Sequence, residues 1–90
     1  VDIAHQRVIR DGVTRSLTPT ESKLLHILLR NAGHALHTDF LIDRLWPLQD
    51  VRKDALRVYV HRLRAKVEPD AGHPRYIQTV QGVGYQFTRF

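Results

Sequence analysis

The 90-residue sequence contains no cysteine and no methionine, and it has no long apolar run. Without cysteine the chain can form neither disulfides nor thiolate metal sites, which argues against a small secreted protein held together by disulfides. No apolar segment approaches the roughly 20 residues that a membrane helix needs, and no signal-peptide pattern opens the chain. These absences predict a soluble intracellular domain without a membrane-spanning segment.

The composition is that of a globular domain. Hydrophobic residues make up 42% and charged residues 26% of the chain, so a folded domain is expected rather than a disordered tail. A chain this short supports one hydrophobic core and leaves little room for a large catalytic cleft. We therefore expect one domain over residues 1–90, and the start at Val1, without a preceding turn or cap, suggests a segment of a longer protein.

The excess of positive charge lies in the second half of the chain. Residues 1–50 carry six basic and six acidic side chains, whereas residues 51–90 carry eight basic and three acidic ones, which accounts for the net charge of +5. A localised basic surface suits nucleic-acid phosphates or an anionic membrane surface. The alternative is a solvated surface with extra arginine, and charge alone does not decide between them.

The N-terminal third of the chain predicts strands followed by a helix. Val1 and Ile3 alternate with polar neighbours, and Asp11-Gly12 is a tight-turn signal, so the first sixteen residues are expected to form a small antiparallel sheet. Thr18 is placed to cap a helix that has Pro19 at its first position and Glu21 completing a capping box. Leucines then recur at helical spacing as a core stripe, and Gly33 provides a left-handed stop.

Two more helices and a hairpin are predicted in the rest of the chain. Thr38 is a candidate cap for a short second helix that Pro47 ends, and a third helix is expected over about 51–67. Residues 76–88 contain two β-prone runs, and Gly82 and Gly84 provide the backbone freedom for the bend between them. The fold class is therefore α+β.

The third predicted helix has one apolar and one basic face. At about 100° per residue, the stripe expected to be buried consists of Leu56, Val60, Leu63 and Val67. The opposite side and its flanks hold Asp54, Arg57, Val58, Tyr59, His61, Arg62, Arg64, Ala65 and Lys66. Arginine reads guanine edges in the major groove, small apolar side chains can meet a thymine methyl, and flanking cations reach phosphates. Alternatively, these charges only keep an amphipathic helix in solution.

Four motifs, taken in order, resemble the OmpR/PhoB-type winged-helix DNA-binding domain of bacterial two-component response regulators. They are Leu17-Thr18-Pro19-Thr20-Glu21, Leu45-Trp46, the segment 58–66 and the segment 79–85. The resemblance implies a winged helix-turn-helix with an N-terminal antiparallel sheet, a three-helix core and a C-terminal β-hairpin wing. It also implies sequence-specific binding of duplex DNA as a transcription regulator, with the third helix in the major groove and the wing toward the minor groove.

The resemblance further implies a cellular setting. A receiver domain is expected to precede this effector domain, and its phosphorylation would promote binding of two copies to tandem direct repeats in the cytoplasm of a bacterium, at the nucleoid. The loop 47–53 corresponds to the loop through which some members contact RNA polymerase. Neither a catalytic activity nor a cofactor is expected.

Residue roles follow from the resemblance position by position. The base-contacting positions are Arg62, Val58 and Ala55. The positions that contact the DNA backbone are Trp46, Tyr59, His61, Arg64 and Thr79. Additional DNA contacts are expected from Arg57, Asp54, Lys66 and Gln81. Gln81 stands where arginine is frequent in the family, which predicts weaker wing contacts. Arg57 stands where an acidic residue is common and Asp54 where a basic one is common, which predicts a different base preference.

Other functions are less compatible with the residues. His34 and His37 lie in a predicted turn without any cysteine, which argues against zinc. The carboxylates are scattered rather than paired near a base or nucleophile, which argues against an enzyme. Duplex RNA is disfavoured because the major groove of A-form RNA does not admit a helix. The main alternative is a winged-helix protein-interaction module, which should present an apolar patch on the third helix instead of arginines.

Overall fold

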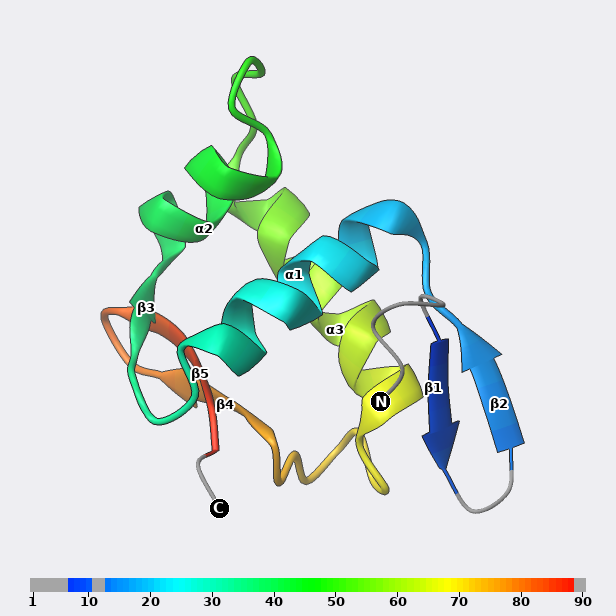
Figure 1. Cartoon of the computed structure of the whole chain (residues 1–90). Coiled ribbons are helices and arrows are strands. Elements are labelled where there is room, and N and C mark those ends of the chain that lie inside the picture. The colour runs from blue at the N-terminus through cyan, green and yellow to red at the C-terminus, as the bar shows by residue number, and fades with distance from the viewer. Residues whose placement is uncertain (1–6, 11–12, 89–90) are drawn as a thin grey trace.

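The computed structural model describes residues 7–10 and 13–88, and its elements follow the predicted order (Figure 1). The elements are β1 (Arg7–Arg10), β2 (Val13–Ser16), α1 (Pro19–Arg30), β3 (Leu36–His37), α2 (Thr38–Leu45), α3 (Lys53–Val67), β4 (Ile77–Val80) and β5 (Gly84–Phe87). The N-terminal pair of strands, the three helices and the C-terminal hairpin confirm the predicted α+β architecture. The predictions for Val1, Ile3 and the Asp11-Gly12 turn lie outside the described residues.

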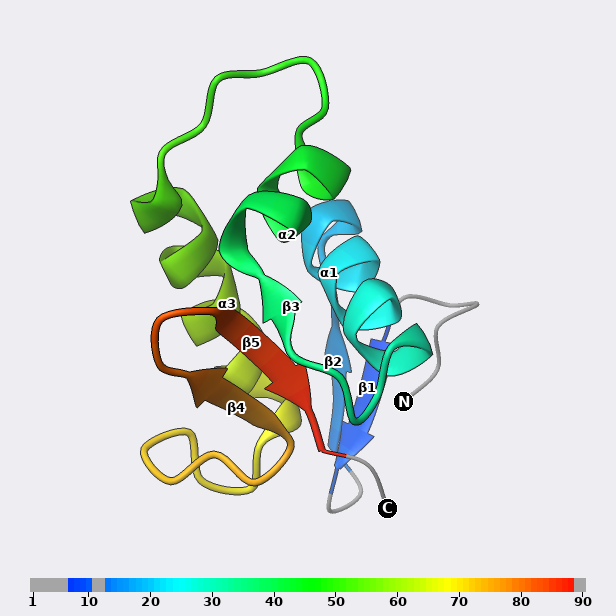
Figure 2. The same ribbon diagram turned by 90° about the vertical axis from the view of Figure 1, so that its left-hand side faces the viewer.

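The hydrophobic core lies where the three helices meet the C-terminal sheet (Figures 1 and 2). The buried apolar residues are Leu17, Leu24, Leu25, Leu28, Leu41, Ile42, Leu45, Leu56, Val60, Leu63, Val67, Ile77 and Phe87. The predicted α3 stripe is thus buried along its whole length, which leaves the opposite face of α3 for solvent or a partner. No helix in the described part of the chain is both long and apolar enough to cross a bilayer.

The ends of the helices agree with some of the capping signals in the sequence and not with others. The capping box of α1 is present, because the Glu21 amide donates to Thr18 Oγ1 at 3.2 Å and the Thr18 amide donates to Glu21 Oε1 at 2.9 Å. Gly33 has the expected left-handed conformation, with a φ of 89°. The prediction for Thr38 is wrong, because the N-cap of α2 is His37, whose side chain makes no capping bond. The Thr38 hydroxyl instead donates to the carbonyl of Val83.

A short strand that the sequence did not predict completes the C-terminal sheet. β3 pairs antiparallel with β5, which also pairs with β4, so the strand order is β3-β5-β4 (Figure 2). Gly82 has a φ of 76° and makes the bend, as expected. Gly84 has a different role, because an added Cβ would lie 2.1 Å from the carbonyl oxygen of Leu36. Its missing side chain allows β3 to approach β5.

A buried carboxylate connects α1 with α3. Glu21 is only 2% exposed, and its Oε1 accepts a hydrogen bond from the Lys66 ammonium at 2.6 Å. The same ammonium also donates to the carbonyl of Ser16. Burial acts to raise the pKa of Glu21, but the hydrogen bond and charge of Lys66 and the bonds from Thr18 outweigh it, so the pKa lies below its ordinary value of 4.5. The ionised form of Glu21 is therefore the one that stabilises the fold.

Glu21→Gln is expected to destabilise the domain at neutral pH and to weaken its acid sensitivity. A carboxyl group whose folded pKa is depressed contributes stability above its unfolded pKa and loses it as the pH falls through the folded value. Removing the charge from this bond should cost about 1.5–3 kcal/mol at pH 7. Urea denaturation of both proteins at pH 7 and pH 3 measures the effect, and an equal difference at the two pH values would contradict it.

Candidate nucleic-acid interface

The exposed face of α3 carries most of the residues predicted to contact DNA. Asp54, Arg57, Val58, His61 and Arg62 are exposed, and Ala55 and Tyr59 are partly buried. Val58 is an apolar side chain with 45% of its surface exposed in the middle of this face. The face therefore combines cations with small or apolar side chains, and it is not a continuous apolar patch.

Aromatic rings support Arg62 from the side of α2. The Arg62 guanidinium lies over the ring of Tyr59, 5.4 Å from its centroid. The Tyr59 ring in turn packs at a tilt against Trp46, the residue that ends α2, with 5.4 Å between the centroids. A cation over an aromatic face is attracted by the electron density of the ring. These contacts bring three of the predicted residues together and restrict the conformations available to Arg62.

Arg64 and Thr79 also come together, but they bind each other. Arg64 Nη2 donates to Thr79 Oγ1 at 2.9 Å, and Arg64 Nε and Nη2 both donate to the carbonyl of Ile77 at 3.0 and 2.8 Å. The guanidinium lies over the ring of Tyr85. Burial lowers the pKa of Arg64, while Tyr85 and Glu68 act in the opposite direction, and the group remains a cation at neutral pH.

Lys66 lies away from the other predicted contacts. Its ammonium binds Glu21 and the carbonyl of Ser16, at the side of α3 that faces α1 and β2. Helical spacing placed Lys66 on a flank of the exposed face, but its partners lie some 45 residues earlier in the sequence and could not be inferred from the helix alone. Lys66 thus has a role in joining α1 to α3, and its DNA contact stays a prediction.

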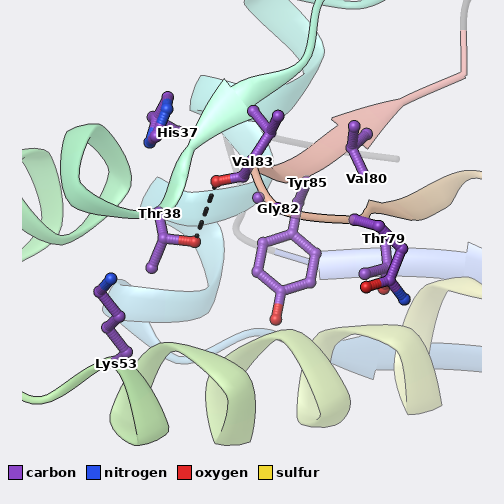
Figure 3. A pocket seen from close by; sticks show the side chains of 10 residues that line it. His37, Thr38, Lys53, Thr79, Val80, Gly82, Val83 and Tyr85 are labelled. Carbon is purple, nitrogen blue, oxygen red and sulfur yellow. Dashed lines mark hydrogen bonds between the residues drawn. The ribbon is translucent and has the colours of Figure 1, made fainter.

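A pocket of about 280 Å³ separates the start of α3 from the wing. Its lining residues are His37, Thr38, Lys53, Thr79, Val80, Gln81, Gly82, Val83, Gly84 and Tyr85. Figure 3 shows Lys53 at the first turn of α3, opposite Tyr85 and Thr79 of the hairpin. Thr79 and Gln81 are among the residues predicted from the sequence to contact DNA, whereas Lys53 and Tyr85 are not. Lys53 is a cation at the start of a basic helix, next to the predicted contact Asp54, and this position could have indicated a DNA contact.

Glu68 is a further residue whose role was not predicted from the sequence. It ends α3, is 1% exposed, and its carboxylate accepts bonds from the backbone amides of Arg75, Tyr76 and Ile77 at 2.8 to 3.0 Å. The segment from Glu68 to Gly72 was interpreted only as a helix stop. A glutamate followed by proline and glycine gives no local indication that its carboxylate binds the next strand.

Two other predictions concern the surroundings of α3. The loop between α2 and α3 extends away from the helices (Figures 1 and 2), and its Leu48 is 97% exposed. His34 and His37 are exposed, and in the described part of the chain no three His, Asp or Glu side chains form a cluster that could hold a metal.

A three-helix core with a β-hairpin wing and an exposed, basic third helix defines the winged-helix class of domains. The sequence matches the family described as "Transcriptional regulatory protein, C terminal" over residues 12–87. It is 41% identical over 88 residues to the transcriptional regulatory protein KdpE of Mycobacterium tuberculosis, a match that covers 97% of this chain and 39% of that protein. The chain therefore belongs to this family of transcription regulators, and it spans about two fifths of the length of that relative.

Solved structures confirm the OmpR/PhoB-type winged-helix fold. The response regulator DrrB of Thermotoga maritima, an OmpR/PhoB homologue, is similar with a TM-score of 0.80 and 33% identity, over 87% of this chain and 36% of that one. The DNA-binding domain of Klebsiella pneumoniae RstA, in complex with RstA box, has a TM-score of 0.80 and 28% identity, over 97% of this chain and 87% of that one. Both the predicted family and the predicted fold are thus confirmed.

Proposed function

We propose that this chain binds duplex DNA sequence-specifically and serves as the DNA-binding module of a transcription regulator. The observation that carries the proposal is the exposed face of α3, where Arg62 is held over Tyr59 next to the exposed Val58. An α-helix of this kind fits the B-DNA major groove, in which arginine forms two bonds to guanine and valine meets a thymine methyl. The similar RstA domain has been solved in complex with RstA box, which supports the same use of the fold.

The remaining contacts are divided between bases and phosphates. In the major groove, Ala55 would allow close approach to the bases, and Asp54 would accept a hydrogen bond from a cytosine amino group. The proposed contacts to the DNA backbone are made by Trp46, Tyr59, His61, Thr79 and Arg57. The wing would place Gln81 toward the minor groove. The pocket between α3 and the wing would receive a phosphate beside Lys53, whose ammonium is the cation on its α3 side.

The regulatory setting is part of the same proposal. A receiver domain would precede the module, and its phosphorylation would favour two copies bound head to tail on direct repeats in a bacterial cytoplasm. The loop 47–53, which extends away from the helices and leaves Leu48 97% exposed, would contact RNA polymerase. The family and its relatives support the transcriptional role.

Selection from a random duplex pool tests the proposal. The purified domain is incubated with the pool at two salt concentrations, and the bound DNA is sequenced. Enriched direct repeats with half-sites about 10–10.5 base pairs apart are expected, because one helical turn separates copies bound to the same side of the duplex. Retention without enrichment would contradict sequence-specific binding, and no retention at low salt would favour a protein-interaction module.

Arg62→Ala is expected to reduce discrimination at one base pair of the selected half-site. Losing a two-bond contact to guanine should cost about 1–3 kcal/mol on the selected sequence and far less on random DNA. Fluorescence anisotropy with the selected duplex and with single base-pair variants measures the difference. Equal losses on selected and random DNA would show that Arg62 does not read a base.

Lys53→Ala is the matched control for this experiment. Because Lys53 is assigned to a phosphate, its loss should weaken all sequences similarly and reduce the salt dependence of binding by about one unit of slope. The two variants therefore remove one cation each from the same helix, and they separate base readout from phosphate attraction.

A further inference from the structure

Two charged side chains at the C-terminal end of α3, Arg64 and the C-cap residue Glu68, hold the backbone of a single wing residue. Arg64 donates from Nε and Nη2 to the carbonyl of Ile77 at 3.0 and 2.8 Å, and the Glu68 carboxylate accepts from the amide of Ile77 at 2.8 Å. Glu68 lies four positions after Arg64, and the two side chains bind the same residue. Ile77, the first residue of β4, is fully buried among the core residues. Both polar groups of its backbone are thus bound to the recognition helix.

These bonds are of the strong and directional kind. Hydrogen bonds in which one partner is charged are shorter and stronger than neutral ones. Nε and Nη2 of Arg64 converge on one carbonyl oxygen, so the edge of the planar guanidinium is directed at Ile77. Glu68 adds the amides of Arg75 and Tyr76, so one buried carboxylate binds three successive backbone groups. β5 pairs with β4 along its whole length, and hence the hairpin takes its direction from α3.

The far end of the hairpin is held separately. The amide of Thr38 donates to the carbonyl of Val83 at 3.1 Å, which joins the turn of the wing to the start of α2. The wing is therefore fixed at both ends, at its base by α3 and at its turn by α2. A hairpin fixed in this way presents its tip at a constant distance from the exposed face of α3.

We propose that Arg64 and Glu68 are positioning residues that set the wing relative to α3, and thereby keep the wing and the helix in register on DNA. The inference rests on the proposed DNA binding and changes the expected role of Arg64. Its guanidinium, half buried and bound to Ile77 and Thr79, acts on DNA through the wing rather than by holding a phosphate. Glu68 cannot contact DNA at all, because it is buried and negatively charged.

The decisive comparison uses the half-site selected by the wild-type domain and two altered duplexes. One carries changed base pairs under α3, and the other carries changed base pairs in the flank toward the wing. Wild-type protein should discriminate against both changes, by about tenfold or more under α3 and by a smaller but measurable factor in the flank, because Gln81 predicts weaker wing contacts. Arg64→Gln, Arg64→Lys and Glu68→Gln should retain the first discrimination and lose most of the second. Gln78→Ala is the control. Gln78 lies on the same strand, and in the described contacts its side chain binds only the nearby carbonyl of Pro74, so this variant should retain discrimination against both altered duplexes.

Salt dependence separates a positioning role from a phosphate contact. If Arg64 positions the wing, Arg64→Lys should be as defective as Arg64→Gln, because an ammonium cannot form the two-nitrogen contact to Ile77. The salt slope of both should equal that of the wild type. A phosphate contact predicts instead that Arg64→Gln lowers the slope by about one unit and that Arg64→Lys restores binding. That second pattern would overturn the proposal.

Nuclear magnetic resonance of the wild-type domain provides a test that does not depend on how the variants fold. The Nε–H signal of Arg64 and the amide signal of Ile77 should be protected from exchange in the free protein and should remain so on the selected duplex. Release of the Nε–H on DNA binding would refute the positioning role. If the wild type selects no sequence, the proposed function itself fails, whereas variants that keep the flank discrimination would contradict only this inference.

Discussion

Leu63→Ala should lower the free energy of unfolding by about 2–5 kcal/mol, because the leucine side chain is completely buried and its removal leaves a cavity in the core. For a domain of this size, each kcal/mol corresponds to a shift of about 4–8 °C in the melting temperature. Leu63 lies in the middle of the buried stripe of α3, where it contacts the core formed by all three helices. Differential scanning calorimetry and urea denaturation measure the loss.

Val58→Ala is the matched control on the same helix. The Val58 side chain is 45% exposed on the opposite face, so its truncation should change the stability by less than about 0.5 kcal/mol while weakening binding to the selected DNA. Unchanged thermal stability of Leu63→Ala would mean that the two faces of α3 are assigned the wrong way round.

Gly84→Ala should destabilise the domain by about 3 kcal/mol or more, a loss at the upper end for single substitutions. The new Cβ would lie 2.1 Å from the carbonyl oxygen of Leu36 and 2.8 Å from the amide nitrogen of Thr38. Both are backbone atoms that cannot rotate away, so β3 must separate from β5. DNA binding should fall as well, because the turn of the wing loses its attachment to α2.

Gly82→Ala distinguishes crowding from backbone strain in the same turn. Gly82 has a φ of 76°, but no atom lies within 4 Å of an added Cβ. An alanine there should cost about 1–2 kcal/mol, the usual price of a left-handed conformation for a residue with a side chain. Thermal melting of the two variants should therefore rank Gly84→Ala well below Gly82→Ala, and the reverse order would contradict the crowding between β3 and β5.

The helical core was predictable because its signals are local. The capping box of Thr18 and Glu21 lies within four residues, and the periodic leucines of α1 and the apolar stripe of α3 lie within single helices. Thr38 is a position where local signals are not sufficient. Its position suits a cap, but its hydroxyl binds Val83, and nothing near Thr38 in the sequence indicates a partner in the wing. The two-residue strand β3 was not predicted for the same reason, because it is defined by its pairing with the distant strand β5.

The candidate site was predictable as a surface and less so as a set of contacts. Helical spacing separates the exposed residues of α3 from its buried ones, and the resemblance to a family assigns roles to positions. Neither helical spacing nor the resemblance reveals which arginine and lysine side chains bind partners inside the fold. Arg64 binds Ile77, and Lys66 binds Glu21 across 45 positions of sequence, so only a folded chain distinguishes them from Arg62. Glu68 was missed because the segment that it binds follows a turn.

The pairing of β3 with β5 also has a consequence for the way the domain folds. Thr38 and Val83, which join the two regions, are 45 positions apart, and pairing over such a separation raises the contact order and slows folding. During synthesis β5 is made after the three helices, so the C-terminal sheet is the last part of the domain to be completed. A chain truncated ahead of Gly84 would contain the sequence of all three helices but lack the strand that β3 pairs with, which leaves the edge of β3 open to other molecules.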